Sequence, residues 1–259
     1  MNISSISKVE ELTNQKSLSD CAKYAHTLDF NRKLDSALRT IEKFLKCTQN
    51  PVISCGGGKD GTAVALLAQL IGATEISIVC AEPPNPLPDR EAHNKELKKW
   101  LGNEWTAIQY SWNVDAVLDG CEKYPDGLKM KMLSEYQKEH DVDGVIFGIR
   151  AAESRSRAIN LAVRGEIYRV ADGGWRCQPI AHWSAEDSIC LALLMDAPIN
   201  PVYLKMQGCG NLEQLHDGTW WPHGLEDRSG WMKKYYPEYY ELYERALKTE
   251  SDRLLPCSY

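Results

Sequence analysis

The sequence predicts an α/β fold: an open, mainly parallel, twisted sheet with helices on both faces. Short apolar runs typical of buried strands alternate with segments of helical periodicity, and this alternation is typical of parallel sheets with right-handed crossovers. A glycine-rich turn joins the first strand of the main domain to a helix. The run 143–149 is apolar almost throughout, as expected of a strand buried on both faces of a parallel sheet.

The first part of the chain, residues 1–50, is polar and has a helical pattern. Leu34, Leu38, Ile41 and Leu45 recur three to four residues apart, which predicts a helix that packs on the main domain. Pro51 then marks the entry to the first strand, because the residue before a proline avoids helical geometry. We therefore predict a helical N-terminal extension over residues 1–50.

The main domain, predicted to span residues 51–206, has a Rossmann-like order of elements. Strands are expected around 52–54, 75–82, 105–112 and 143–149, and helices over 62–71, 89–101, 115–121 and 127–140. Asp89 is expected to cap the second of these helices. Two shorter strands, 166–170 and 175–180, flank an Asp-Gly-Gly turn and predict a hairpin. A capping box at Ser184–Asp187, which by itself would account for Asp187, starts a helix that runs to about Met195.

The remaining residues, 207–259, are predicted to form an irregular and helical C-terminal tail. Glycine, tryptophan and histidine are frequent over 207–228 and periodicity is lost, so this segment is expected to be a loop. Residues 237–247 are rich in tyrosine and are expected to form a final helix.

Composition favours a cytoplasmic globular protein. The 259 residues are 43% hydrophobic and 25% charged, and a net charge of −6 gives no sign of a basic nucleic-acid surface. No apolar run approaches the roughly 20 residues that span a bilayer, and the N-terminus lacks the apolar core of a secretory signal. The nine cysteines are widely spaced without a Cys-x-x-Cys pair, which predicts reduced thiols and neither an iron–sulfur cluster nor a zinc ribbon.

The glycine-rich turn between Pro51 and Gly72 is the strongest candidate site. Glycine lets the backbone approach a phosphate closely, and the start of the following helix offers unpaired N–H groups and the positive end of a dipole. Lys59 adds a mobile cation. We therefore expect a nucleotide phosphate over Gly56–Gly61. The candidate ligands of this phosphate in and beside the turn are Ser54, Gly56, Gly57, Gly58, Lys59, Gly61 and Thr62.

The residues of this turn admit a dinucleotide-binding interpretation. Gly56, Gly58 and Gly61 fit Gly-x-Gly-x-x-Gly after a strand and before a helix, and Glu82 lies where an acid would bind a ribose hydroxyl. Against it, the Asp60 carboxylate would repel a pyrophosphate unless a metal or lysine intervenes. A Walker A loop is excluded, because its lysine must precede Ser or Thr and Lys59 precedes Asp60.

Four segments, in order over 52–203, support a second interpretation. Ser54–Gly61 resembles the Ser-Gly-Gly-Lys-Asp-Ser pyrophosphate loop of the adenine nucleotide α-hydrolase superfamily. Gly148–Arg155 is similar to Gly-Ile-Arg-x-x-Glu-Ser, Cys177–Asp187 to Pro-Ile-x-x-Trp-x-x-x-Asp, and Pro198–Tyr203 to Pro-x-Asn-Pro-x-Tyr. With these segments the chain resembles the phosphoadenosine phosphosulfate (PAPS) reductase family.

This resemblance implies an enzyme that binds ATP, PAPS or adenylyl sulfate and acts at the α-phosphate or the sulfate. It implies either adenylation of an acceptor with loss of pyrophosphate, or sulfur transfer. Lys59, Asp60 and Arg150 are the expected catalytic residues. The segment that resembles Gly-Ile-Arg-x-x-Glu-Ser, with the residues just after it, adds four candidate nucleotide ligands, namely Gly148, Glu153, Arg155 and Arg157. The acceptor is not identified, and a homo-oligomer is left open.

Several of these residues have two candidate roles. Arg150 follows a buried strand, where a guanidinium suits bidentate contact with phosphate or sulfate, or else pairs with Glu153 or Asp60. Asp60 either binds a magnesium ion that bridges phosphates or holds the loop by accepting backbone N–H bonds. Glu153 would anchor Arg150 or the loop. Trp183 and Tyr203 are expected to pack rather than to stack on a base.

The sequence departs from the family pattern at two places. Gly56 and Gly61 replace the loop serines, leaving Ser54 and Thr62 as substitutes. The C-terminal Glu-Cys-Gly-Leu-His type motif of the reductases is absent, since Cys257 stands between Pro256 and Ser258. The alternative is therefore a nucleotide-binding regulatory protein without catalysis. A thiol-dependent PAPS reductase and an NAD-dependent oxidoreductase rank below it.

Overall fold

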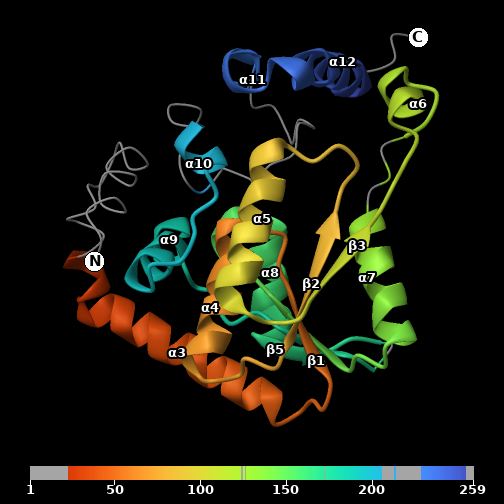
Figure 1. The fold of residues 1–259 in the computed structure, drawn as a ribbon. Helices are drawn as coiled ribbons and strands as arrows, with labels where there is room; N and C mark the ends of the chain where they lie inside the picture. Colours follow the sequence, from red (N-terminus) through yellow and green to blue (C-terminus); the bar gives the residue numbers. More distant parts are fainter. Residues whose placement is uncertain are drawn as a thin grey trace.

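The computed structural model describes residues 23–205 except 124, 126 and 172, together with residue 213 and residues 229–254. It confirms the α/β class (Figure 1). A six-stranded open sheet has the order β3-β2-β1-β4-β6-β5, and only the β5–β6 pair is antiparallel. The strands are β1 (Pro51–Ser54), β2 (Ser77–Glu82), β3 (Trp105–Gln109), β4 (Gly144–Phe147), β5 (Ile167–Arg169) and β6 (Trp175–Cys177).

The helices follow the strands much as predicted. They are α3 (Leu28–Leu45), α4 (Lys59–Leu70), α5 (Pro88–Leu101), α6 (Val114–Leu118), α7 (Leu128–Glu139), the short 3₁₀ helix η1 (Ala151–Glu153), α8 (Arg155–Arg164), α9 (Ala185–Leu194), α10 (Val202–Lys205), α11 (Ser229–Tyr235) and α12 (Pro237–Leu254). Helices α8, α10 and α11 and the 3₁₀ helix η1 were not predicted. Within the described residues, every helix is too short or too polar to cross a lipid bilayer.

The alternation of side chains along the strands divides the core between the two faces of the sheet. Ile53, Ile78 and Ile146 pack with residues of α3, α4, α5 and α9 on one face. Val52 and Val145, which are partners in the β1–β4 register, pack on the other face together with α7. Burial on both faces holds the central strands rigid, and their carboxyl ends form a fixed edge.

Helix α3 is joined to α9 by a buried carboxylate. Asp187 is fully buried; it lies 3.1 Å from Lys33 Nζ and accepts a 2.7 Å hydrogen bond from the Tyr24 hydroxyl. The predicted capping box is present, because Ser184 N donates to Asp187 at 2.6 Å. The prediction that the capping box alone accounts for Asp187 is wrong, since this carboxylate also fixes the N-terminal helix.

Helices α11 and α12 lie beyond the carboxyl ends of the strands (Figure 1). Their aromatic side chains form a separate core cluster with residues of α6, α10 and the loop before α5. Tyr236 donates to the Asp89 carboxylate, and the Tyr239 hydroxyl donates to Pro86 O at 3.0 Å. Asp89 is therefore not the cap of α5: Leu87 holds that position and Pro88 opens the helix.

The loop predicted over 207–228 lies outside the described residues except for Glu213. The predicted domain bounds stay predictions.

Replacing Tyr236 with phenylalanine is expected to lower the free energy of unfolding by about 1 kcal/mol, because Asp89 loses a hydrogen bond in a largely buried setting. Tyr240→Phe is the matched control, since its hydroxyl donates to Glu244 within one exposed helix turn. Urea unfolding of both variants measures the difference. Equal losses would show that Tyr236 does not tie α11 and α12 to α5.

Candidate functional site

The glycine-rich turn lies at the carboxyl end of β1 and leads into α4, as predicted. Gly58 is the N-cap of α4 and Lys59 is its first residue. Gly57 has a φ of +83°, and a Cβ added there would lie 1.8 Å from Asn94 Oδ1. The backbone conformation therefore favours glycine at position 57, and a larger residue there would also displace the Asn94 side chain.

Gly148, at the end of β4, packs directly against the turn. A Cβ on Gly148 would lie 2.4 Å from the backbone carbonyl carbon and oxygen of Asp60 and 2.7 Å from Gly61 N. The backbones of the two segments therefore touch with no side chain between them. This contact brings together two sequence motifs that lie about 90 residues apart, and it explains why the second begins with glycine.

A cavity of about 330 Å³ opens over the turn; we call it the notch. The predicted residues that line it are Ser54, Gly56, Gly58, Lys59, Asp60, Gly61, Gly148, Glu153 and Arg157. Those that do not line it are Gly57, Thr62, Glu82, Arg150 and Arg155. Sequence reasoning missed Arg90, Lys129, Met130, Phe147 and Ile149, and it expected Tyr203 only to pack.

Arg150 is fully buried behind the turn and pairs with Asp60. Its Nε lies 2.8 Å from Asp60 Oδ1, and its Nη1 pairs with Glu213. Burial alone would lower the pKa of Arg150, but the Asp60 and Glu213 carboxylates outweigh it and raise the pKa, so the guanidinium stays charged. Of the two candidate roles of Arg150, the ion pair with Asp60 is present, and phosphate contact stays a prediction.

Asp60 is surrounded by donors and cations. Ser188 Oγ donates to its Oδ1 at 2.8 Å, and Lys59 Nζ lies 3.4 Å from its Oδ2. With Arg150 also on Oδ1, this carboxylate fits poorly as a magnesium ligand, because two cations already face it. The arrangement fits the second candidate role, holding the loop, although side chains rather than backbone N–H groups are the partners. Nothing in the sequence singled out Ser188.

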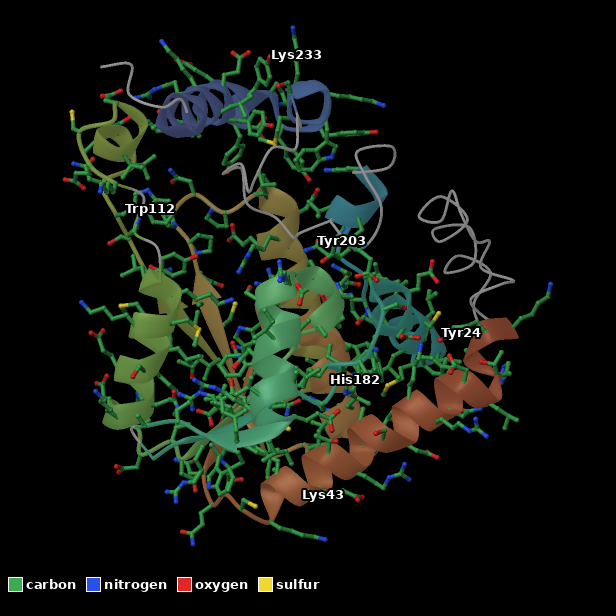
Figure 2. All side chains as sticks on the ribbon, turned by 180° about the vertical axis from the view of Figure 1, so that it is seen from behind. Tyr24, Lys43, Trp112, His182, Tyr203 and Lys233 are labelled. Carbon is green, nitrogen blue, oxygen red and sulfur yellow. The ribbon has the colours of Figure 1, made fainter. Side chains whose placement is uncertain are left out.

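Tyr203 supports the turn from α10 (Figure 2). Its hydroxyl accepts a 2.9 Å hydrogen bond from Lys59 N, and Lys59 Nζ lies 5.6 Å from the centroid of its ring. The ring is buried, as expected of a packing residue, but it also fixes the start of α4. Trp183 is buried and packs on Phe30, with the two ring centroids 6.0 Å apart.

Glu153 connects the second motif to the notch. Its Oε2 accepts a 2.9 Å hydrogen bond from Arg150 N and pairs with Arg157. Arg155 is exposed at the start of α8. Thr62 is buried, and its Oγ1 has no hydrogen-bond partner among the described residues. Of the two substitutes proposed for the missing loop serines, only Ser54 reaches the notch.

The described cysteines are free thiols, and none of them lines the notch. Cys55 is fully buried in the sheet core, as predicted. Burial raises the pKa of Cys177, so its thiol stays protonated. Within the described residues, no three His, Cys, Asp or Glu side chains gather in a way that could hold a metal ion.

A comparison of the sequence with known families identifies the family to which this chain belongs. The family model described as the phosphoadenosine phosphosulfate reductase domain matches residues 50–213, which is more than half of the chain. The chain belongs to the PAPS reductase domain family. The resemblance inferred from the four motifs is thereby confirmed. A search of curated proteins gave no match.

Solved structures with a similar fold include proteins of several named activities. A PAPS reductase from Candida auris in a phosphate complex is 12% identical, with a TM-score of 0.50 over 68% of this chain and 90% of that one. An FMN adenylyltransferase from Candida glabrata in complex with ATP is 13% identical, with a TM-score of 0.51 over 76% and 64%. The U34-tRNA thiolase NcsA from Methanococcus maripaludis with its [4Fe-4S] cluster is 14% identical, with a TM-score of 0.52 over 88% and 82%. At these identities the likeness shows the fold.

Proposed function

We propose that this member of the PAPS reductase domain family is an enzyme that binds an adenine nucleotide in the notch and acts at its α-phosphate. The observation that carries the proposal is the notch itself: a glycine turn at the N-terminus of α4, on the carboxyl edge of a parallel sheet. Open α/β sheets bind ligands at this edge, and helix N-termini favour phosphate.

The charges around the notch support phosphate binding. Lys59, Arg90, Lys129 and Arg157 line it, against the two carboxylates of Asp60 and Glu153. In the proposed complex the phosphates lie over Gly56–Gly61, where glycine leaves the backbone N–H groups accessible. Lys59 offsets the charge that grows on the departing group, a role that is typically worth several kcal/mol. Arg150 is a positioning residue that acts through Asp60.

The apolar residues that line the notch support binding of a nucleobase. Phe147 and Ile149 at the end of β4, with Met130 of α7, give it an apolar wall. Ligand sites commonly combine apolar walls with a few placed polar groups, and a volume of about 330 Å³ lies within their range of about 300–1,000 Å³. The base then packs on this wall while the phosphates extend to the turn.

The favoured reaction is adenylation of an acceptor. An acceptor oxygen attacks the α-phosphorus, the bond to the bridging oxygen breaks, and pyrophosphate leaves with the electron pair. PAPS is the second candidate substrate after ATP, because the matching family model describes a PAPS reductase domain. In that complex the sulfate of PAPS would occupy the place of the pyrophosphate of ATP. Thiol-dependent reduction is less favoured because the sequence lacks the Glu-Cys-Gly-Leu-His type motif that supplies the thiol.

Calorimetric titration with ATP and magnesium tests the binding step. Lys59→Ala is expected to weaken ATP binding by roughly 10- to 100-fold, because a charged hydrogen bond contributes about 1.5–3 kcal/mol. Lys131→Ala is the control, since Lys131 is an exposed cation on α7 that pairs with Glu135 and does not line the notch. Equal affinities of the two variants for ATP, or a wild-type protein that does not bind ATP, would refute the site.

Prolonged incubation with ATP, followed by chromatography for AMP and pyrophosphate, tests the chemistry. Because no acceptor is added, water attacks the α-phosphorus in its place, and slow release of AMP and pyrophosphate by the wild type is the expected result. Lys59→Ala is expected to lose this activity. A parallel incubation with PAPS shows which nucleotide is used. Tight binding without turnover of either nucleotide would instead support the regulatory protein without catalysis.

A further inference from the structure

A second cavity, of about 660 Å³, lies beside the notch, and Arg90 lines both. Its walls are Glu82 at the end of β2, the proline-rich loop 83–86, helix α5 and strand β3; we call it the α5–β3 groove. Arg90 is only 6% exposed, and its Nη2 donates to Ala81 O at 3.0 Å. A Cβ on Gly56 would lie 3.0 Å from the same nitrogen. The guanidinium is therefore a fixed partition between the two spaces.

The floor of the α5–β3 groove is one face of the edge strand β3. Trp105, Ala107 and Gln109 alternate along this strand, and all three line the groove. At about 3.3 Å per residue, these positions span about 13 Å. The groove thus extends from the carboxyl edge of the sheet, beside Arg90, toward the amino edge at Trp105.

Helix α5 gives the groove a wall of net positive charge, because Arg90, Lys95 and Lys98 line it against the single carboxylate of Glu91. Lys95 and Lys98 line it, both are exposed, and neither forms an ion pair with a described residue. Because β2 and β3 are parallel, α5 runs back between them, and its last turn lies at the same end as Trp105. The far end of the groove therefore combines a flat aromatic surface with an ammonium group. Lys99, next along the helix, does not line the groove.

We propose that the α5–β3 groove binds the acceptor, and that the acceptor is an anion that carries a flat ring. This inference depends on the proposed function, in which the nucleotide occupies the notch and leaves the space across Arg90 for the second reactant. Arg90 is then placed to face both the α-phosphate and the attacking oxygen. That oxygen is already ionised and needs no base: it bonds to the α-phosphorus as pyrophosphate leaves. The ring packs on Trp105 at the far end, the attacking anion reaches toward Arg90, and Lys95 and Lys98 on the α5 wall offset its negative charge.

Titrations with three probes test this assignment. FMN carries a flat ring and a phosphate, anthranilate a ring and a carboxylate, and riboflavin the flavin ring without the anion. FMN or anthranilate is expected to bind the wild type at least fivefold more tightly than riboflavin. Binding of FMN would indicate a phosphate as the anion of the acceptor, and binding of anthranilate a carboxylate. The double variant Lys95→Ala/Lys98→Ala is expected to weaken that binding by about tenfold, from two exposed charge pairs. The charge-matched double variant Lys99→Ala/Lys131→Ala is expected to leave it unchanged.

The affinity for ATP, measured on the same variants, separates this inference from the proposed function. ATP binding is expected to be equal in the wild type and in both double variants. If the groove variant loses ATP affinity, the groove holds the nucleotide and the acceptor assignment is wrong. The assignment is also wrong if neither anionic probe binds better than riboflavin, or if the two double variants behave alike. A wild type that binds FMN or anthranilate as expected but does not bind ATP would refute the proposed function and leave the groove as an anion site.

Discussion

Replacing Gly148 with alanine is expected to abolish nucleotide binding and to lower the free energy of unfolding by about 3 kcal/mol, the upper end of typical overpacking costs. The added methyl group would lie 2.4 Å from the backbone of Asp60, and a backbone cannot move aside as a flexible side chain can. Because Gly148 does not have a positive φ, the loss would come from space alone. Urea unfolding and ATP titration measure the two effects.

Gly230→Ala is the matched control for this substitution. Gly230 lies in helix α11, and an added Cβ would meet nothing within 4 Å. Alanine favours helix over glycine, so this variant is expected to be as stable as the wild type or more stable by up to about 1 kcal/mol. If Gly148→Ala behaved like Gly230→Ala, the backbone contact between β4 and the glycine turn would not matter for the site.

Replacing Asp60 with alanine is expected to lower the free energy of unfolding by about 3 kcal/mol, because the buried guanidinium of Arg150 loses one of its two carboxylate partners. Arg150 stays fully buried in this variant, and Glu213 is then its remaining carboxylate partner at the guanidinium. ATP affinity is expected to fall as well, since Asp60 also fixes Lys59. Denaturant unfolding and calorimetry measure the two losses.

A double-mutant cycle isolates the ion pair from other effects of losing Asp60. Asp60→Ala/Arg150→Met removes both charges and is expected to be more stable than Asp60→Ala alone. Asp119→Ala, which breaks an exposed pair with Arg245, is expected to cost less than about 1 kcal/mol. Additive losses in the cycle would show that Asp60 and Arg150 do not depend on one another.

The fold was predictable from the sequence because each signal was local. The apolar run 143–149, the glycine turn and the Ser184 capping box each describe one element, and α/β alternation then fixes the sheet. Helix α8, which buries no residue, was not recognised from the sequence. Asp89 was misassigned because its partner, Tyr236, is remote in sequence.

The site residues that belong to local sequence motifs were predictable, whereas those that only tertiary packing brings to the site were not. The glycine turn and Gly148 were found from motifs, and they do meet. Arg90, Lys129 and Ser188 were missed because each lies within an ordinary helix, and only the packing of that helix turns it toward the notch or Asp60. The roles of the site residues, the acceptor, the oligomeric state and the cellular location stay predictions.

The contact between Tyr236 and Asp89 also constrains how the protein matures on the ribosome. These residues are 147 positions apart, so the start of α5, which carries Arg90, gains its final support only after α11 has been synthesised. The sheet and the glycine turn can collapse earlier, because their strands precede residue 178. A nascent chain is therefore expected to acquire its nucleotide-binding surface in two stages, with the groove side completed last.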